Sequence, residues 1–287
     1  MSLPVTLPAA ARFAGIVGVL LATAPPRGDP PQTEALILVG ASFLGQEMRS
    51  KRGSPVTRCP GIAAVLLAIL LTTGLARAQS APDTMEARVQ ACALCHGTLG
   101  QGTNNNYFPR LAGKPAGYLY NQLVAFRSAR RRYPPMNYLL EYQPDAYLRA
   151  IAGYFAGQRP PLPPPVMPIV SRDLLALGQT LVLHGDPNRG IPACAGCHNP
   201  LFTGMEPAIP GLLGLQPGYI SAQLGAWRYG TRTAIAPDCM QLVSGHLTET
   251  DVTAVAAWLS TLPAPANAAP VPRGTLAMPL PCGSEPN

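Results

Sequence analysis

Apolar residues recur at helical spacing in six short segments of the chain, and stretches rich in proline and glycine separate these segments. Within each segment they fall three or four positions apart, which places them on one face of a helix. The expected helices cover residues 85–91, 117–130, 144–156, 173–184, 218–228 and 248–262. The last begins at Thr248, with Asp251 three residues later, a variant of the capping box that marks a helix start. The pattern therefore predicts a mainly α-helical protein.

The helical pattern occurs twice. Residues 117–127 and 218–228 share the frame Gly-Tyr-x-x-x-Gln-Leu-x-Ala-aromatic-Arg, at an offset of 101 residues. A repeat of this length indicates that a whole domain has been duplicated, rather than that the chain is a solenoid. We predict a first domain at residues 79–158 and a second at residues 172–262.

Two proline-rich segments flank the second domain. In the predicted linker, residues 159–171, five of the six positions from Pro160 to Pro165 are proline. Such a segment cannot continue a helix and should be stiff and extended. Residues 263–287 are predicted to form an irregular C-terminal tail.

A ten-residue apolar run, Ile62–Leu71, follows a basic cluster and precedes the small-x-small sequence Ala76-Arg77-Ala78. This order is typical of a secretory signal peptide, so residues 48–78 are predicted to direct export to the periplasm and to be removed. The run is shorter than the roughly 20 residues that span a bilayer; an uncleaved signal would remain as a membrane anchor.

The signal peptide is expected to begin at Met48, so the residues before it need an explanation. We interpret residues 1–47 as an extension from a start site assigned too early. The alternative is that residues 9–24 and 35–44, which are short apolar stretches, are weak membrane segments.

Composition and charge exclude some classes of protein. Charged residues make up 12% of the chain and hydrophobic residues 47%, so composition does not predict disorder. The formal charge of +7 falls to +3 after residue 78, where fourteen basic and eleven acidic residues remain. Without a basic stripe that includes aromatic residues, we predict no binding of nucleic acid.

Each domain contains the sequence Cys-x-x-Cys-His, which is typical of a c-type haem attachment site. Two thiols at this spacing can bond to the two vinyl groups of one porphyrin, and the histidine is then held against the iron. One such motif could instead be a zinc knuckle or a redox dithiol, but two copies favour two covalently bound haem c groups. The residues are Cys92, Cys95 and His96 in the first domain and Cys194, Cys197 and His198 in the second.

Each iron needs a second axial ligand, and a methionine thioether suits an electron carrier because it favours reduced iron. Met136 lies 40 residues after His96, and Met240 lies 42 residues after His198. Both are expected in irregular loops, with a proline shortly before. A methionine can also be a flexible core residue, but this shared position predicts that Met136 and Met240 are the axial ligands.

The free ring N–H of a haem-bound histidine is usually held by a carbonyl group. Pro109 and Pro210 follow the two histidines by 13 and 12 residues, respectively, and are candidates to supply that carbonyl. Alternatively, they are simple turn residues.

These features resemble the two-haem class I cytochromes c of the cytochrome c4 family. The residues that carry the resemblance are the two attachment sites, Pro109–Gly113, the two Gly-Tyr frames, Met136 and Met240. The resemblance implies two tandem class I cytochrome c domains, each wrapped around one haem with histidine and methionine ligands. It also implies electron delivery toward a terminal oxidase. The chain departs from the family in its proline-rich linker, Cys239 and the extended tail.

The leading functional hypothesis is a periplasmic electron carrier with no catalytic site. One alternative is the cytochrome subunit of a dehydrogenase complex; another is a two-haem enzyme, either a peroxidase or a thiosulfate-oxidising cytochrome. Two methionine ligands disfavour an enzyme, because they leave no open iron for a substrate. The expected partners are a quinol-oxidising complex, a dehydrogenase and a terminal oxidase, with loose membrane association as a further option.

Two cysteines, Cys239 and Cys282, remain after those of the signal peptide and the haem sites. In an oxidising compartment, an even number of remaining cysteines usually forms disulfides. A disulfide is therefore predicted that would tether the tail beside Met240. The alternatives are two free thiols, or Cys239 as an iron ligand.

Arginines gather at the end of each Gly-Tyr segment, and some are expected to hold haem propionates because a guanidinium group suits carboxylates. Others could face an acidic partner, or simply form a solvated helix end. The arginines are Arg127, Arg130, Arg131 and Arg132 in the first domain and Arg228 and Arg232 in the second.

Overall fold

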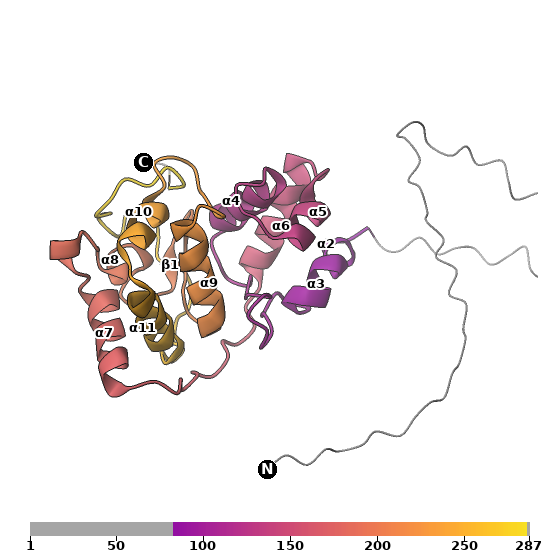
Figure 1. Cartoon of the computed structure of the whole chain (residues 1–287). Helices are drawn as coiled ribbons and strands as arrows, with labels where there is room; N and C mark the ends of the chain where they lie inside the picture. The colour runs from indigo at the N-terminus through magenta and orange to yellow at the C-terminus, as the bar shows by residue number, and fades with distance from the viewer. Residues whose placement is uncertain (1–82, 286–287) are drawn as a thin grey trace, which may run out of the picture. The chain divides into compact units, whose positions relative to one another are not determined.

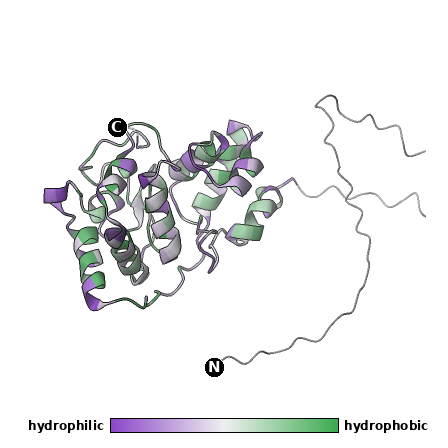
Figure 2. Ribbon diagram, viewed as in Figure 1, coloured by the Kyte–Doolittle hydropathy of each residue, from purple (hydrophilic) through white to green (hydrophobic). Residues whose placement is uncertain are grey.

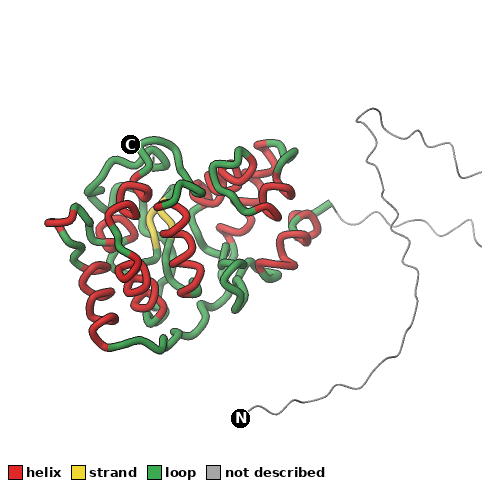
Figure 3. The backbone as a smooth tube through the Cα atoms, in the orientation of Figure 1, coloured by secondary structure: helices red, strands yellow, loops and turns green. Residues whose placement is uncertain are grey.

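The structure is a computed structural model that describes residues 83–285 (Figure 1). The signal peptide predicted at 48–78 and the extension at 1–47 lie outside the described residues. Within the described part, helices are joined by irregular loops and one two-stranded hairpin (Figure 3). No helix of residues 83–285 is both long and apolar enough to cross a bilayer.

The first repeat packs its described helices around one apolar core. These are α2 (Met85–Arg88), α3 (Gln90–His96), α4 (Ala116–Arg127), α5 (Pro134–Leu140) and α6 (Asp145–Gly157). Helices α4 and α6 make the most extensive contact. The apolar stripe of α6, Leu148, Ile151, Ala152 and Phe155, is fully buried there. The helix expected at 144–156 is therefore confirmed.

The second repeat has a similar helical core and adds the hairpin. Its helices are α7 (Arg172–Leu183), η1 (Pro187–Arg189), α8 (Cys194–His198), α9 (Pro217–Arg228), α10 (Cys239–His246) and α11 (Glu249–Ser260). Helix α7, hydrophobic beyond its first turn in Figure 2, packs closely on α11. A Cβ atom at Gly178 would lie 2.1 Å from the carbonyl oxygen of Ala254. Only glycine allows the two helices to approach so closely.

The start of α11 confirms the capping box expected at Thr248. The Thr248 hydroxyl accepts a hydrogen bond from the backbone N–H of Asp251 at 3.1 Å, and the Asp251 carboxylate accepts one from the N–H of Thr248 at 2.8 Å. Both backbone donors would otherwise lack a helical partner.

The prediction that Met136 and Met240 lie in irregular loops is wrong, because Met136 lies in α5 and Met240 in α10. Pro134 and Pro135 occupy the first turn of α5. Proline is tolerated there because the N–H groups of the first turn have no partner within the helix. At α10, the Asp238 side chain caps the helix by accepting from the N–H of Gln241. The prolines therefore precede or start short helices instead of breaking them.

Three other segments differ from the expectation in detail. The helix expected at 85–91 is two helices, and the second continues through the attachment motif to His96. Helix α4 ends at Arg127 rather than at residue 130, because Ala129 has a φ of +56° in the left-handed region. Between two of the expected helices, residues 199–210 contain the hairpin of β1 (Gly204–Met205) and β2 (Ile209–Pro210), in which Gly204 pairs with Pro210.

The linker and the tail have no helix or strand, as predicted, but both are held against the folded repeats. The Arg110 guanidinium donates to the carbonyl oxygens of Pro160 and Pro161 at 2.5 and 2.9 Å. In the tail, Val271 forms a parallel bridge with Met205 of the hairpin. These contacts place the two irregular segments on defined surfaces of the protein.

Candidate haem sites and the contact between them

The first attachment motif opens onto a large, mostly apolar cavity of about 580 Å³. Cys92, Cys95 and His96 line this cavity together with Met136, although 40 residues separate His96 from Met136. The motif lies in α3, where residues three positions apart share one face, so both thiols face the same side.

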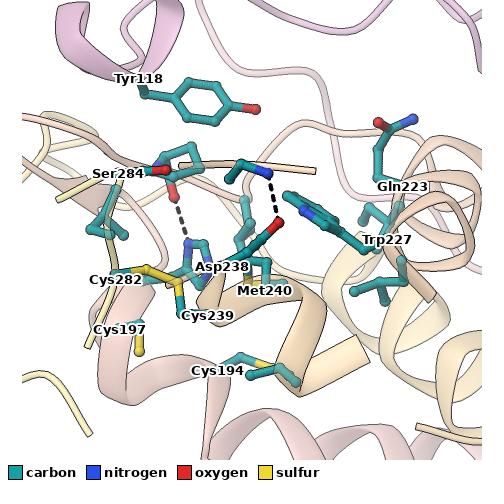
Figure 4. A pocket seen from close by; sticks show the side chains of 18 of the residues that line it. Tyr118, Cys194, Cys197, Gln223, Trp227, Asp238, Cys239, Met240, Cys282 and Ser284 are labelled. Atoms are coloured by element: carbon teal, nitrogen blue, oxygen red, sulfur yellow. Dashed lines mark hydrogen bonds between the residues drawn. A yellow bond between two sulfur atoms is a disulfide. The ribbon is translucent and has the colours of Figure 1, made fainter. Parts of the chain in front are cut away.

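The second attachment motif opens onto a smaller cavity of about 160 Å³, drawn in Figure 4. Cys194, Cys197, His198 and Met240 line it. Both repeats therefore bring together two thiols, one imidazole and one thioether. The structure places every sequence-predicted ligand of each haem beside its own attachment motif.

Both histidines are held by the predicted carbonyl groups. The Nδ1 atoms of His96 and His198 lie 2.8 and 2.7 Å from the carbonyl oxygens of Pro109 and Pro210, respectively. A carbonyl oxygen can only accept, so Nδ1 donates and Nε2 is left free to bind iron. Burial lowers the pKa of both rings, which favours the neutral imidazole that a metal requires.

The cysteines of the motifs are poor candidates for a redox dithiol or a zinc knuckle. Burial raises the pKa of the Cys194 thiol to about 12, and it also raises the pKa of Cys92 and Cys197. A reactive redox dithiol needs the thiolate form. In addition, residues 83–285 contain no group of three or more His, Cys, Asp and Glu side chains that could hold a metal ion.

An unpaired polar atom gives an independent sign that the second cavity takes a further group. Trp227 lines this cavity, and its indole Nε1 is buried without a hydrogen-bond partner in the described part of the chain. A buried donor without a partner costs about 1–3 kcal/mol. A haem bound here would bring carboxylate oxygens that can accept this N–H. The residues of the site therefore fit a haem.

A buried polar cluster lies between the two cavities. Arg131, from the loop after α4, donates to the side-chain oxygens of Tyr219 and Gln223 at 2.9 and 2.7 Å and of Gln122 at 2.9 Å. Arg131 is 8% exposed. It also lies over the ring of Phe126, 4.5 Å from its centroid.

Arg232 repeats this arrangement from the other side. It donates to Gln223 and Gln122 at 2.8 Å each and to the Tyr118 hydroxyl at 3.3 Å. It is 3% exposed and lies 3.6 Å over the ring of Trp227. We call this set the interface cluster; it consists of Tyr118, Gln122 and Arg131 from the first repeat and Tyr219, Gln223 and Arg232 from the second.

The backbone joins the same two loops directly. The N–H of Arg132 donates to the carbonyl oxygen of Thr231 at 3.0 Å, and the N–H of Thr233 donates to that of Arg130 at 2.7 Å. The Gly-Tyr frames thus have a shared role that sequence reasoning missed. Their Tyr and Gln are four residues apart and lie on one helix face, and the identity of the two frames was the signal that could have revealed it.

The arginines singled out in the sequence therefore divide into two groups. Arg131 and Arg232 are buried, and neither forms an ion pair with a carboxylate of residues 83–285. Arg127 instead pairs with Asp145 at 2.5 Å, and Arg228 lies near the ring of Tyr229. Arg131 and Arg232 each line a cavity, and so does the exposed Arg132, so these three guanidinium groups are the ones placed to meet haem carboxylates.

The tail closes over the second cavity. Cys239 and Cys282 form a disulfide, which Figure 4 shows beside Met240. Leu280, Cys282 and Ser284 line the same cavity. The Glu285 carboxylate accepts from the backbone N–H of Ala208 at 3.0 Å, so the end of the described tail is also held. No residue of the described part of the tail, 263–285, lines the first cavity.

Known proteins share this organisation. A thiosulfate dehydrogenase electron acceptor from Thiomonas intermedia (strain K12) is 36% identical over 173 residues, which cover 60% of this chain and 79% of the relative. Cytochrome c4 from Pseudomonas aeruginosa is 34% identical over 203 residues, which cover 69% of this chain and 98% of the relative. No protein-family model matches the chain.

The fold also matches a solved structure. The crystal structure of reduced recombinant cytochrome c4 from Pseudomonas stutzeri superposes with a TM-score of 0.55 at 29% identity, covering 62% of this chain and 96% of that one. The matched proteins are named as cytochrome c4 or as an electron acceptor, that is, as electron carriers. The chain belongs to the cytochrome c4 family of two-haem c-type cytochromes and is an electron-transfer protein rather than an enzyme.

Proposed function

We propose that this protein is an exported electron carrier that receives single electrons from a dehydrogenase and passes them toward a terminal oxidase. The observation that carries the proposal is the pair of cavities, each lined by two thiols, a histidine and a methionine. The electron acceptor from Thiomonas intermedia supports a dehydrogenase as the electron donor. Delivery to an oxidase rests on the resemblance to cytochrome c4.

The haems supply the one-electron redox chemistry when they are bound, and the chain supplies their ligands and their environment. We propose that His96 and Met136 hold the first iron and His198 and Met240 the second. The carbonyl groups of Pro109 and Pro210 fix the two imidazole rings. One histidine and one methionine on each iron would leave no iron site for a substrate, which suits a carrier.

The interface cluster gives the two cavities a fixed spacing. Its side chains line both cavities and cross the contact between the repeats in both directions. A short separation favours electron transfer between two sites, and Tyr219, Gln223 and Arg232 line both cavities. We propose that the two haems exchange electrons across this cluster.

The donor can be tested directly with the purified two-haem protein. A thiosulfate dehydrogenase and thiosulfate are mixed anaerobically with the oxidised protein, and haem absorbance is followed. We expect full reduction of both haems, and none when thiosulfate is omitted. Reduction by a quinol-oxidising complex but not by the dehydrogenase would replace the proposed donor with a quinol-linked one.

Export is proposed from the signal peptide expected at residues 48–78. The mature protein should begin at Gln79 and should be recovered with the periplasmic fraction. Intact-mass measurement of the purified protein tests the cleavage site. A protein that keeps residues 48–78 and sediments with membranes would instead be anchored by this segment.

A further inference from the structure

Lys114 is the one lysine among residues 83–285, and its side chain crosses from the first repeat into the second. It lies in the loop between Pro109 and α4, and it is 7% exposed. Its Nζ donates to the carbonyl oxygen of Gly211 at 2.7 Å. It forms no ion pair with a carboxylate of the described residues. A buried ammonium group without a counter-ion is costly, so its position needs a reason.

The contact with Gly211 brings this charge to the second haem site. Gly211 follows Pro210, whose carbonyl group holds the ring of His198. Lys114 lines the second cavity together with His198 and Met240. Burial is the main cause of the lowered pKa of His198, and the charge of Lys114 lowers it further. The ammonium group and the imidazole therefore interact electrostatically.

This arrangement has no counterpart in the first cavity. At the offset of the repeat, the position equivalent to Lys114 is Leu215, which is apolar. Lys114 lines the second cavity and not the first, whereas Arg232 lines both. Lys114 is thus a charged residue that distinguishes the second cavity from the first.

We propose that Lys114 is a positioning residue for the second haem site, contributed by the first repeat, whose positive charge favours the reduced state of the second haem. Reduction lowers the charge at the iron by one unit, so a nearby cation stabilises the product of reduction. The effect is large for a buried cation, because protein screens charge less than water does. The inference rests on a haem bound in the second cavity, and it does not depend on which protein donates the electron.

The charge on Lys114 is itself sensitive to pH. Burial lowers the pKa of Lys114 to about 8; the nearby Tyr219 acts to raise it, and Arg110 acts to lower it further. The imidazole of His198 is a further titratable neighbour, and Tyr118 and Arg232 line the same cavity. Loss of the proton above that pKa removes the stabilising charge. The potential of the second haem should therefore fall as pH rises through this range, with proton uptake by Lys114 accompanying reduction.

The test compares Lys114→Met, Lys114→Arg and the matched control Arg172→Met in the two-haem protein. Arg172 is exposed at the start of α7, lines neither cavity, and its replacement removes the same charge. An anaerobic redox titration gives both potentials, and NMR signals of the haem methyl groups in partly reduced samples assign each potential to a haem.

We expect Lys114→Met to lower the reduction potential of the second haem by about 30 mV or more. This corresponds to at least a threefold shift of its one-electron equilibrium toward the oxidised state. Lys114→Arg should keep most of the wild-type potential, and Arg172→Met should leave it unchanged. An unchanged second potential in Lys114→Met would overturn the proposal. These potentials are measured without any redox partner, so failure of the proposed dehydrogenase reaction would not affect them.

A measurement on the unmodified protein covers the case in which Lys114→Met does not fold. Lysine labelled with ¹³C at Cε gives one signal from residues 83–285, and its loss in Lys114→Arg assigns it. This signal should titrate near pH 8 in the oxidised protein and at higher pH in the reduced protein. A single titration at the ordinary pKa of a lysine in both states would contradict the proposal.

Discussion

At the scale of single residues, the sequence predicts the cysteines and histidines of the haem sites more directly than it predicts the methionines. The cysteines and histidine of each motif are adjacent in sequence, and α3 and α8 present them together. Met136 and Met240 were inferred from their position in the repeat, and the structure places each in the expected cavity but within a helix. A helix holds a thioether more firmly than a loop does, which suits a ligand that is a weak donor.

The methionines are tested by Met136→Ala and Met240→Ala. Each change should abolish half of the weak sulfur-to-iron band near the red end of the oxidised spectrum and lower one of the two potentials, because the thioether favours reduced iron. Met167→Ala is the control, since Met167 is 78% exposed. If the full band persists in one ligand variant, that methionine does not bind iron.

At the scale of elements, α10 and the tail form a unit that the first repeat lacks. The disulfide joins the first residue of α10 to the tail, next to Met240. The two cysteines are 43 positions apart, so in the chain-entropy model the bond destabilises the unfolded chain by about 4 kcal/mol. The tail therefore stabilises the helix that carries the second thioether.

Replacement of Cys282 by Ser should loosen α10 and weaken the sulfur band of the second haem alone. The first haem serves as the internal control, because no described residue of the tail lines the first cavity. Haem-specific NMR signals and thermal unfolding measure the two effects. An equal loss of the band at both haems would show that the tail acts on the whole protein rather than on α10.

At the scale of the whole described molecule, the interface cluster joins the two repeats. Its buried polar groups form hydrogen bonds with one another. Removing one side chain leaves its partners without hydrogen bonds, which lowers the free energy of unfolding by about 1–3 kcal/mol for each partner. Arg131→Met combined with Arg232→Met should therefore split one cooperative unfolding transition into two, as calorimetry would show. Arg127→Met removes a partly exposed ion pair within one repeat and should cost less than about 1 kcal/mol. Similar curves for both variants would mean that the cluster does not couple the repeats.

The sequence alone determined the features that depend on neighbouring residues. The attachment motifs need only a spacing of three along the chain, and the capping box at Thr248 is a local exchange of hydrogen bonds. The helices of each repeat follow from apolar periodicity, and the duplication was visible as a repeated frame. Features of this kind depend on residues that are close together in the chain, so the sequence alone predicts them.

The tertiary structure alone decided which distant groups meet. Prolines near Met136 and Met240 were compatible with a loop or with a helix start, and only the first turns of α5 and α10 show the helix start. Likewise, the sequence grouped Arg131 with the neighbouring arginines, whereas the structure shows that Arg131 is buried. The sequence also gave no sign that Lys114 reaches Gly211. These contacts join residues about a hundred positions apart, and the packing of one repeat on the other creates them.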